Sequence, residues 1–207
     1  PIEIVIPELW GTQIFKKTEW GDINYLVGPN GSGKSRFIEH LRNKLSSSAK
    51  LRVRYIGTDR LVGWTSNQNT AYLNSQLNNG INLDWFNDLE QNSRNRGEIN
   101  DAFVLLRNNL DIKIKVESVL SQLLNRTVIL EEKGGFLKPQ VSKGNSVSYS
   151  FKENESHGLK EIITLLTLLH DDSYDCLIID EPELHLHPQY QTFFLQEVRR
   201  ISGDPTV

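Results

Sequence analysis

The chain has 207 residues and a formal net charge of −3, with 38% hydrophobic and 24% charged residues, so it can bury a sizeable core beneath a polar surface. The negative balance argues against a nucleic-acid binder that works by bulk charge, although it leaves room for a local basic patch. The single cysteine excludes a disulfide-built scaffold, and no apolar run is long enough for a membrane span or a signal peptide. We therefore expect a cytoplasmic domain with no membrane partner.

The first elements in chain order are two strands, residues 1–6 and 23–27, and the second runs directly into the glycine-rich stretch "GPNGSGKS" at residues 28–35. Apolar residues at helical spacing follow and predict a helix that begins beside the loop. Strand, glycine loop and helix in this order match the complete G-x-x-x-x-G-K-[ST] pattern of a phosphate-binding loop. The plain alternative is a glycine-rich turn whose lysine is merely solvated.

We interpret this stretch as the place where the phosphates of ATP bind. Backbone N–H groups and the helix N-terminus would surround the phosphates, Lys34 would neutralise them, and the Ser35 hydroxyl would hold Mg²⁺. The residues expected to contact the nucleotide here are Gly28, Pro29, Asn30, Gly31, Ser32, Gly33, Lys34, Ser35 and Arg36.

After a third predicted strand at 51–57, the composition changes, and residues 59–150 are interpreted as an inserted arm. Asparagine and glutamine are frequent at its start, where a short helix near 83–91 is expected. Helical spacing between 99 and 124 predicts the main helices of the arm. Because loops on a rigid scaffold often carry recognition, we expect this arm to contact a protein partner or nucleic acid.

Three further strands, within residues 126–151, are separated by "KGG" and "SKGN", which are good turn sequences, and predict a β-meander. Proline cannot donate to a strand ladder. Pro139 therefore predicts that the middle strand is an edge strand or carries a bulge.

The chain returns to regular patterning with "GLKEIITLLTLLH", which predicts a helix, and "CLIID", which predicts a parallel strand buried on both faces. Two carboxylates, Asp180 and Glu181, end that strand, where ligands bind in open α/β sheets. Asp180 can share Mg²⁺ with Ser35, and Glu181 can polarise the water that attacks the terminal phosphate. The alternative is a solvated acidic turn.

The phosphate loop, the long insertion and "LIIDEPELHLHP" together resemble the ABC-type ATPase head, most closely the branch that contains RecF, SMC-like proteins and the OLD family. The resemblance covers about residues 1–58 and 152–207. It implies an α/β fold, a P-loop NTPase of ABC-ATPase type with a mixed or parallel sheet. Residues 1–58 and 151–207 would form the ATPase core around the helical and β-meander arm at 59–150, and the chain would stop where the switch-histidine strand begins.

The family's signature sequence, usually written LSGGQ, would correspond to Glu155-Ser156-His157-Gly158-Leu159. The resemblance implies that Ser156 and Gly158 grip the γ-phosphate of ATP bound to the opposite protomer. Two chains would then form a homodimer around ATP and Mg²⁺. Ser156 can equally be the N-cap of the following helix.

Other family positions are open between functional and ordinary structural roles. Trp10 and Phe15 are candidates for stacking on adenine or for the core. Arg60 would reach the phosphates or be solvated, and Gln68 is the nearest candidate for the Q-loop glutamine.

His185 and His187 are spaced like metal ligands but lack a third ligand, so a loop role at the dimer interface is favoured.

The sequence thus predicts an ATPase, with Lys34 and Glu181 as catalytic residues, whose dimer switches a protein effector or an appended domain. The resemblance to OLD-like proteins implies a role in bacterial anti-phage defence. A DNA-repair or chromosome-maintenance head of the RecF or SMC type stays open, as does a nucleotide-gated scaffold without hydrolysis. A transporter subunit would need a better signature.

Overall fold

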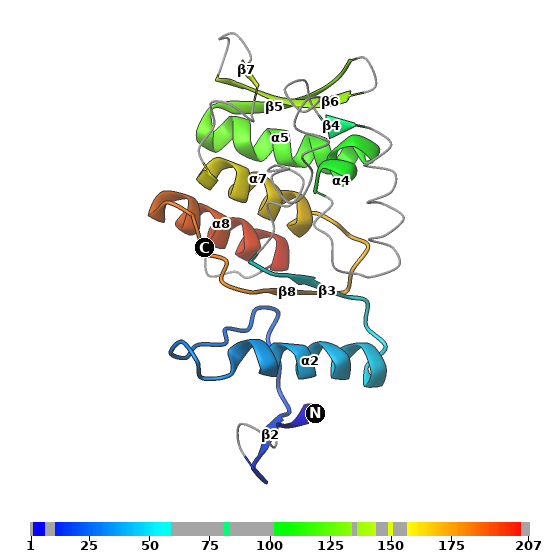
Figure 1. Ribbon diagram of the computed structural model, residues 1–207, viewed down its shortest axis with the longest axis vertical. Helices are drawn as coiled ribbons and strands as arrows, with labels where there is room; N and C mark the ends of the chain where they lie inside the picture. Colours follow the sequence, from blue (N-terminus) through cyan, green and yellow to red (C-terminus); the bar gives the residue numbers. More distant parts are fainter. Residues whose placement is uncertain are drawn as a thin grey trace, which may run out of the picture.

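The protein is described here by a computed structural model, in which the elements stack in layers along the long axis of the molecule (Figure 1). Helices lie on both sides of a small parallel sheet, and a separate antiparallel sheet closes one end. The structure describes residues 2–6, 11–58, 81–82, 102–133, 136–143, 149–150 and 157–203.

The N-terminal end contains β1 (Ile2–Val5), which pairs antiparallel with β2 (Ile14–Lys17), and the helix α2 (Lys34–Ser48), which packs against β1. The rings of Phe15 and Phe37 meet edge to face, with their centroids 4.8 Å apart. Phe15 therefore packs in a small apolar cluster, which is the core role considered for it, and Trp10 lies outside the described residues.

The parallel sheet joins the two predicted halves of the core. It consists of β3 (Val53–Ile56) and β8 (Cys176–Ile179), which are separated by more than a hundred residues in sequence. In Figure 1, α2 lies on one side of this pair, and α7 (His157–Leu169) and α8 (Pro188–Ser202) lie on the other. Both strands were predicted. The expectation that β8 is buried on both faces is wrong, because its residues are half-buried and, within the described part of the chain, only β3 pairs with it.

The centre of the molecule is α7, an apolar helix that is covered on nearly all sides, as an all-round hydrophobic helix must be. It packs against α8 and against two helices of the predicted arm, α4 (Ala102–Asn108) and α5 (Leu110–Leu124). One hydrophobic cluster contains residues of β3 and of all four helices. The helices α4, α5 and α7 were predicted and α8 was not, whereas the division of the chain at residues 58 and 150 stays a prediction.

The antiparallel sheet at the far end contains the predicted meander, with β6 (Phe136–Lys143) between β5 (Arg126–Lys133) and β7 (Tyr149–Ser150). The short strand β4 (Ile81–Asn82) pairs with β6 as well. The sheet covers the side of α5 that faces away from α7 (Figure 1).

The prediction that Pro139 marks an edge strand or a bulge is wrong. β6 has neighbours on both sides, and its register with β5 runs one to one through Pro139, which faces Leu130. On the other side, β4 pairs with residues 136 and 137 and β7 with residues 140 and 141. Pro139 lies between these two short partners, at a place where a missing N–H donor removes no bond from either ladder.

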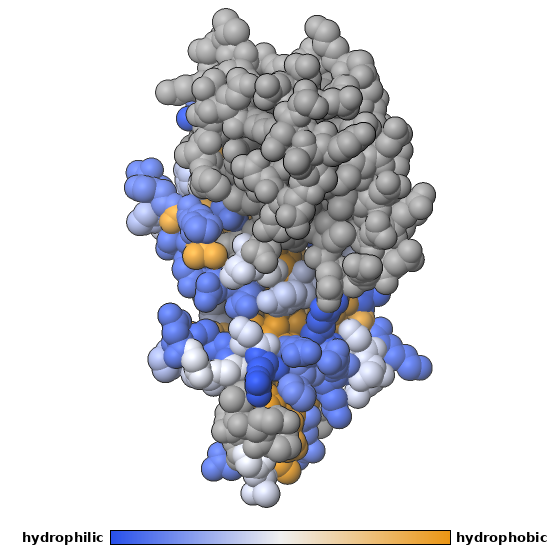
Figure 2. All heavy atoms as spheres, in the orientation of Figure 1, coloured by the Kyte–Doolittle hydropathy of each residue, from blue (hydrophilic) through white to orange (hydrophobic). Residues whose placement is uncertain are grey.

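The strand predicted at 23–27 is also absent, since the structure has no strand there. Tyr25, Leu26 and Val27 are 63%, 45% and 90% exposed, and Figure 2 shows apolar side chains at the surface in the half of the molecule that holds this segment. Its apolar pattern is the one a strand would have, but no described strand pairs with it, so its backbone remains outside the ladders. The helix expected near 83–91 lies outside the described residues.

Two ion pairs connect the region of β3 to the loop before β8, and they differ in burial. Arg54 binds Asp171 at 2.7 Å with both side chains below a tenth exposed. Arg52 also binds Asp175 at 2.7 Å, but their side chains are 60% and 38% exposed. Hydrogen bonds from the Arg52 side chain and backbone hold the pKa of Asp175 at about 2.

We predict that Asp171→Asn lowers the free energy of unfolding by about 3 kcal/mol, because it removes the negative partner of a buried ion pair with Arg54. Asp175→Asn is the matched control and should have a much smaller effect, since water screens that pair. Urea denaturation of both variants checks this, and equal losses would contradict the assignment of Asp171 as the structural partner.

Candidate functional site

The glycine-rich loop at residues 28–33 leads directly into α2, as the sequence predicts. Gly31 and Gly33 have φ values of 80° and 89°, a left-handed backbone that glycine adopts without strain. A Cβ atom on Gly28 would lie 2.9 Å from the Ser32 Oγ, so the Ser32 side chain would have to rotate to accept it. The loop is closed by the Ser32 N–H, which donates to the Pro29 carbonyl at 3.2 Å.

The N-terminus of α2 is open toward a ligand. No side chain caps it, and its first turn contains no acidic residue. The first bond from the loop into the helix is donated by the Phe37 N–H to the Gly33 carbonyl, at 2.9 Å. The N–H groups of the preceding positions therefore have no acceptor within the helix, and their dipoles favour an anion. Ser35 and Arg36 in this turn are exposed.

Lys34 is not a freely solvated lysine. Its Nζ donates to the carbonyl oxygens of Gly28 at 2.8 Å and Pro29 at 3.1 Å. The side chain thus lies across the loop that precedes it and brings a positive charge to the same concave backbone. A glycine-rich turn with a solvated lysine, the alternative in the sequence, does not describe this arrangement.

The two predicted carboxylates follow β8 but differ in their surroundings. The Asp180 N–H continues the parallel ladder by donating to the Ile56 carbonyl at 2.9 Å, and its Oδ2 accepts a hydrogen bond of 3.0 Å from the Tyr55 hydroxyl. Glu181 is exposed and has a φ of 45°, which turns the chain away from the strand direction. Asp180 is therefore fixed by β3, whereas Glu181 lies in the exposed turn that follows the strand.

The phosphate loop and Asp180 lie at the same end of the parallel sheet. A short connection joins the C-terminus of α2 to the start of β3, so the helix runs back along the strand and begins near its carboxyl end. Figure 1 shows the loop before α2 on the same side as the carboxyl ends of β3 and β8. This edge is where open α/β sheets bind ligands.

The predicted signature segment is only partly described. Ser156 lies outside the described residues, while Gly158 lies in the first turn of α7. A Cβ atom on Gly158 would lie 3.2 Å from the His185 carbonyl oxygen and 3.5 Å from the Tyr190 ring. The start of α7 therefore packs closely against the loop that follows Glu181 in the same chain.

The histidines of that loop have structural roles. His187 is the N-cap residue of α8, where its Nδ1 accepts from the Gln189 N–H at 3.4 Å, and its ring meets Tyr190 edge to face. His185 has a φ of 62° at the turn. Among the described residues, no group of three or more His, Cys, Asp or Glu could hold a metal ion. Arg60 and Gln68 lie outside the described residues.

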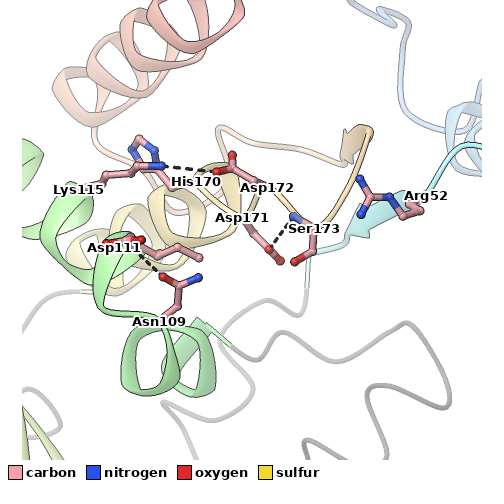
Figure 3. A pocket seen from close by; sticks show the side chains of 9 residues that line it. Arg52, Asn109, Asp111, Lys115, His170, Asp171, Asp172 and Ser173 are labelled. Carbon is pink, nitrogen blue, oxygen red and sulfur yellow. Dashed lines mark hydrogen bonds and ion pairs between the residues drawn. The ribbon is translucent and has the colours of Figure 1, made fainter.

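A polar cavity of about 360 Å³ lies at the opposite, amino end of the parallel sheet, between the start of α5 and the turn after α7 (Figure 3). Two of its cations are already paired, Arg52 with Asp175 and Lys115 with Asp172. His170, which also lines it, is almost fully buried, and burial lowers its pKa. The cavity is separate from the phosphate loop and is lined largely by groups that bind each other.

Sequence reasoning missed Tyr55, Arg54 and Asp171. The alternating pattern of the third strand places Tyr55 on one face, but nothing in the sequence indicates that its hydroxyl reaches a carboxylate 125 residues later. The only indirect signal is that two paired parallel strands place their last residues side by side, so the end of the third strand could be expected near Asp180 if the two strands were neighbours.

The fold and this site define the class of the protein, a P-loop NTPase of the α/β type. A family model described as "AAA domain, putative AbiEii toxin, Type IV TA system" matches residues 60–207, more than half of the chain. The chain therefore belongs to this AAA domain family, whose members are nucleotide-binding ATPases. The matched residues do not include the phosphate loop. The loop pattern and the family match are therefore independent observations, and both indicate a nucleotide-binding protein. No curated protein sequence matches the chain. The described helices include none that is both long and apolar enough to span a membrane.

We predict that Gly158→Ala lowers the free energy of unfolding, although glycine to alanine inside a helix ordinarily raises it by roughly 0.5–1 kcal/mol. The added methyl group would press on the His185 carbonyl, a backbone atom that cannot move away freely. Asn43→Ala, on the exposed side of α2, is the control and should be neutral or stabilising. A gain in stability for Gly158→Ala in chemical denaturation would contradict the close packing.

Proposed function

We propose that this chain binds and hydrolyses ATP, with the phosphates on the loop Gly28–Ser35. The observation that carries the proposal is the position of Lys34, whose Nζ lies on the carbonyls of this loop beside an uncapped helix N-terminus. A phosphate in the loop would accept from the open N–H groups and draw the Lys34 ammonium away from the carbonyls. A positive lysine and a helix dipole would then act on the same anion.

A magnesium ion fits the residues at this edge. Asp180 offers a fixed carboxylate and Ser35 an exposed hydroxyl, both hard oxygen ligands. Mg²⁺ usually takes one or two protein ligands and completes its shell with phosphate oxygens and water, so the lack of a larger acidic cluster among the described residues agrees with this ion. When bound, it would neutralise charge on the phosphates.

Within this site we assign the water-activating role to Glu181. Its exposed carboxylate follows Asp180 and is turned away by the positive φ, so it can face a water while Asp180 faces Tyr55 and the metal site. The chain's residues would thus hold the phosphates, fix the metal ligand and accept a proton from the attacking water.

Hydrolysis would occur in a homodimer in which Ser156 and Gly158 of one protomer contact the γ-phosphate bound to the other. The resemblance to OLD-like ATPase heads supports this arrangement. The description of the matching family names a putative toxin of a type IV toxin–antitoxin system. This description supports a defence role in which the dimer switches an effector or an appended domain. The arm at 59–150 would contact that partner or nucleic acid. A RecF- or SMC-type head and a non-hydrolysing scaffold are the competing functions.

We predict that Lys34→Ala removes ATP binding while the fold is kept, because within the described part of the chain the lysine ammonium donates to loop carbonyls and not to the core. Lys44→Ala, an exposed lysine on the same helix, is the control and should bind ATP normally. Isothermal titration calorimetry with ATP and Mg²⁺, together with circular dichroism, measures both. Unchanged affinity in Lys34→Ala would exclude the loop as the phosphate site.

We predict that Glu181→Gln hydrolyses ATP about 10²–10⁴-fold more slowly, the usual loss when a general base is removed. ATP binding should survive, and the ATP-bound dimer should accumulate in light scattering. The matched control is Glu183→Gln, an exposed carboxylate in the same turn, which should keep the wild-type rate. Turnover at the wild-type rate in Glu181→Gln would mean that another group activates water. If the wild-type protein itself hydrolyses no ATP, the nucleotide-gated scaffold without hydrolysis would be favoured.

A further inference from the structure

Asp180, the proposed metal ligand, is held by β3 through two contacts, one from Tyr55 and one from Ile56. The Tyr55 hydroxyl donates to the Asp180 Oδ2 at 3.0 Å, and the carbonyl of the next residue, Ile56, accepts from the Asp180 N–H at 2.9 Å. Backbone and side chain of β3 therefore fix Asp180 at the same time. A carboxylate held in this way has little freedom to rotate.

The Tyr55 ring is itself held in place. A Cβ atom on Gly57 would lie 3.2 Å from the ring Cε1 and 3.6 Å from the hydroxyl oxygen, so the ring fits because Gly57 has no side chain. The guanidinium of Arg42, in α2, lies 6.0 Å from the ring centroid, within the range of a cation–π contact. The ring thus lies between the helix that follows the phosphate loop and the strand end that holds Asp180.

We propose that Tyr55 is a positioning residue for the divalent metal, an inference that rests on the proposed function. The hydroxyl donates to the Asp180 Oδ2 and so fixes the orientation in which the carboxylate would meet the ion. Carboxylates that bind metals are themselves oriented by hydrogen bonds, and removing such a bond typically costs 10–100-fold in metal affinity. Tyr55 would not touch nucleotide.

A purely structural role for Tyr55 makes a different prediction. In that case the ring would matter and the hydroxyl would not, so phenylalanine would replace it without effect on metal binding. Tyr174 offers a matched comparison, because it is also half-buried and has an arginine, Arg54, 5.0 Å from its ring centroid, but it lies before the amino end of β8.

The experiment uses Mn²⁺ as the probe, with electron paramagnetic resonance to measure the free ion in the presence of saturating ADP. We expect Tyr55→Phe to weaken Mn²⁺ binding about tenfold. ADP affinity in EDTA and the circular dichroism spectrum should stay at wild-type values, and Tyr174→Phe should bind Mn²⁺ normally. Equal Mn²⁺ affinity in Tyr55→Phe and wild type would overturn the inference while leaving the proposed function standing.

A double-mutant cycle separates positioning from packing. In an Asp180→Asn background, Tyr55→Phe should weaken Mn²⁺ no further, because the hydroxyl acts through that carboxylate. A loss of the same size in both backgrounds would assign Tyr55 to general structure and overturn the inference. If the wild type binds no Mn²⁺ with ADP, the metal site of the proposed function fails, and the role of Tyr55 fails with it.

Discussion

The parallel pairing of β3 with β8 is the constraint on which the rest of the structure depends. It joins segments more than a hundred residues apart, and each end of the ladder carries a specific contact. At the amino end Arg52 binds Asp175, and at the carboxyl end β3 holds Asp180 through its N–H and its carboxylate. Because α2 leads directly into β3, the same pairing brings the phosphate loop to the edge where Asp180 lies. One ladder thereby brings residues from both halves of the chain to one edge of the sheet.

The helix α7 connects the two ends of this sheet. Its first turn packs on the loop after Glu181, through the close contact of Gly158 with the His185 carbonyl. Its other end leads into buried charges, where Asp171 binds Arg54 and His170 lies 3.2 Å from a Glu197 oxygen. Hydrogen bonds from Arg200 hold the pKa of Glu197 below its ordinary value, so this carboxylate stays charged in the interior. A helix fixed at both ends keeps its first turn, with Gly158, against the loop that follows the strand end.

Patterns within single elements could be predicted from the sequence, and contacts between elements could not. Helical spacing predicted α5 and α7, and the glycine pattern predicted the turn into α2, because these signals are local. The segment at 23–27 has a strand-like pattern but no partner among the described strands, and Pro139 lies in a central strand at a position that neither β4 nor β7 pairs with. Tyr55 became visible as part of the site only once the register of β3 against β8 was known.

We propose that the loop Gly28–Ser35 and Asp180 form one site for ATP and a divalent metal. A crystal structure of the chain with a non-hydrolysable ATP analogue and Mg²⁺ tests it most directly. We expect phosphate oxygens on the N–H groups of the loop, the Lys34 Nζ moved from the Gly28 and Pro29 carbonyls to phosphate, and the metal between Ser35 and Asp180. Nucleotide bound elsewhere, or a metal that Asp180 does not contact while Tyr55 keeps its hydrogen bond, would contradict it.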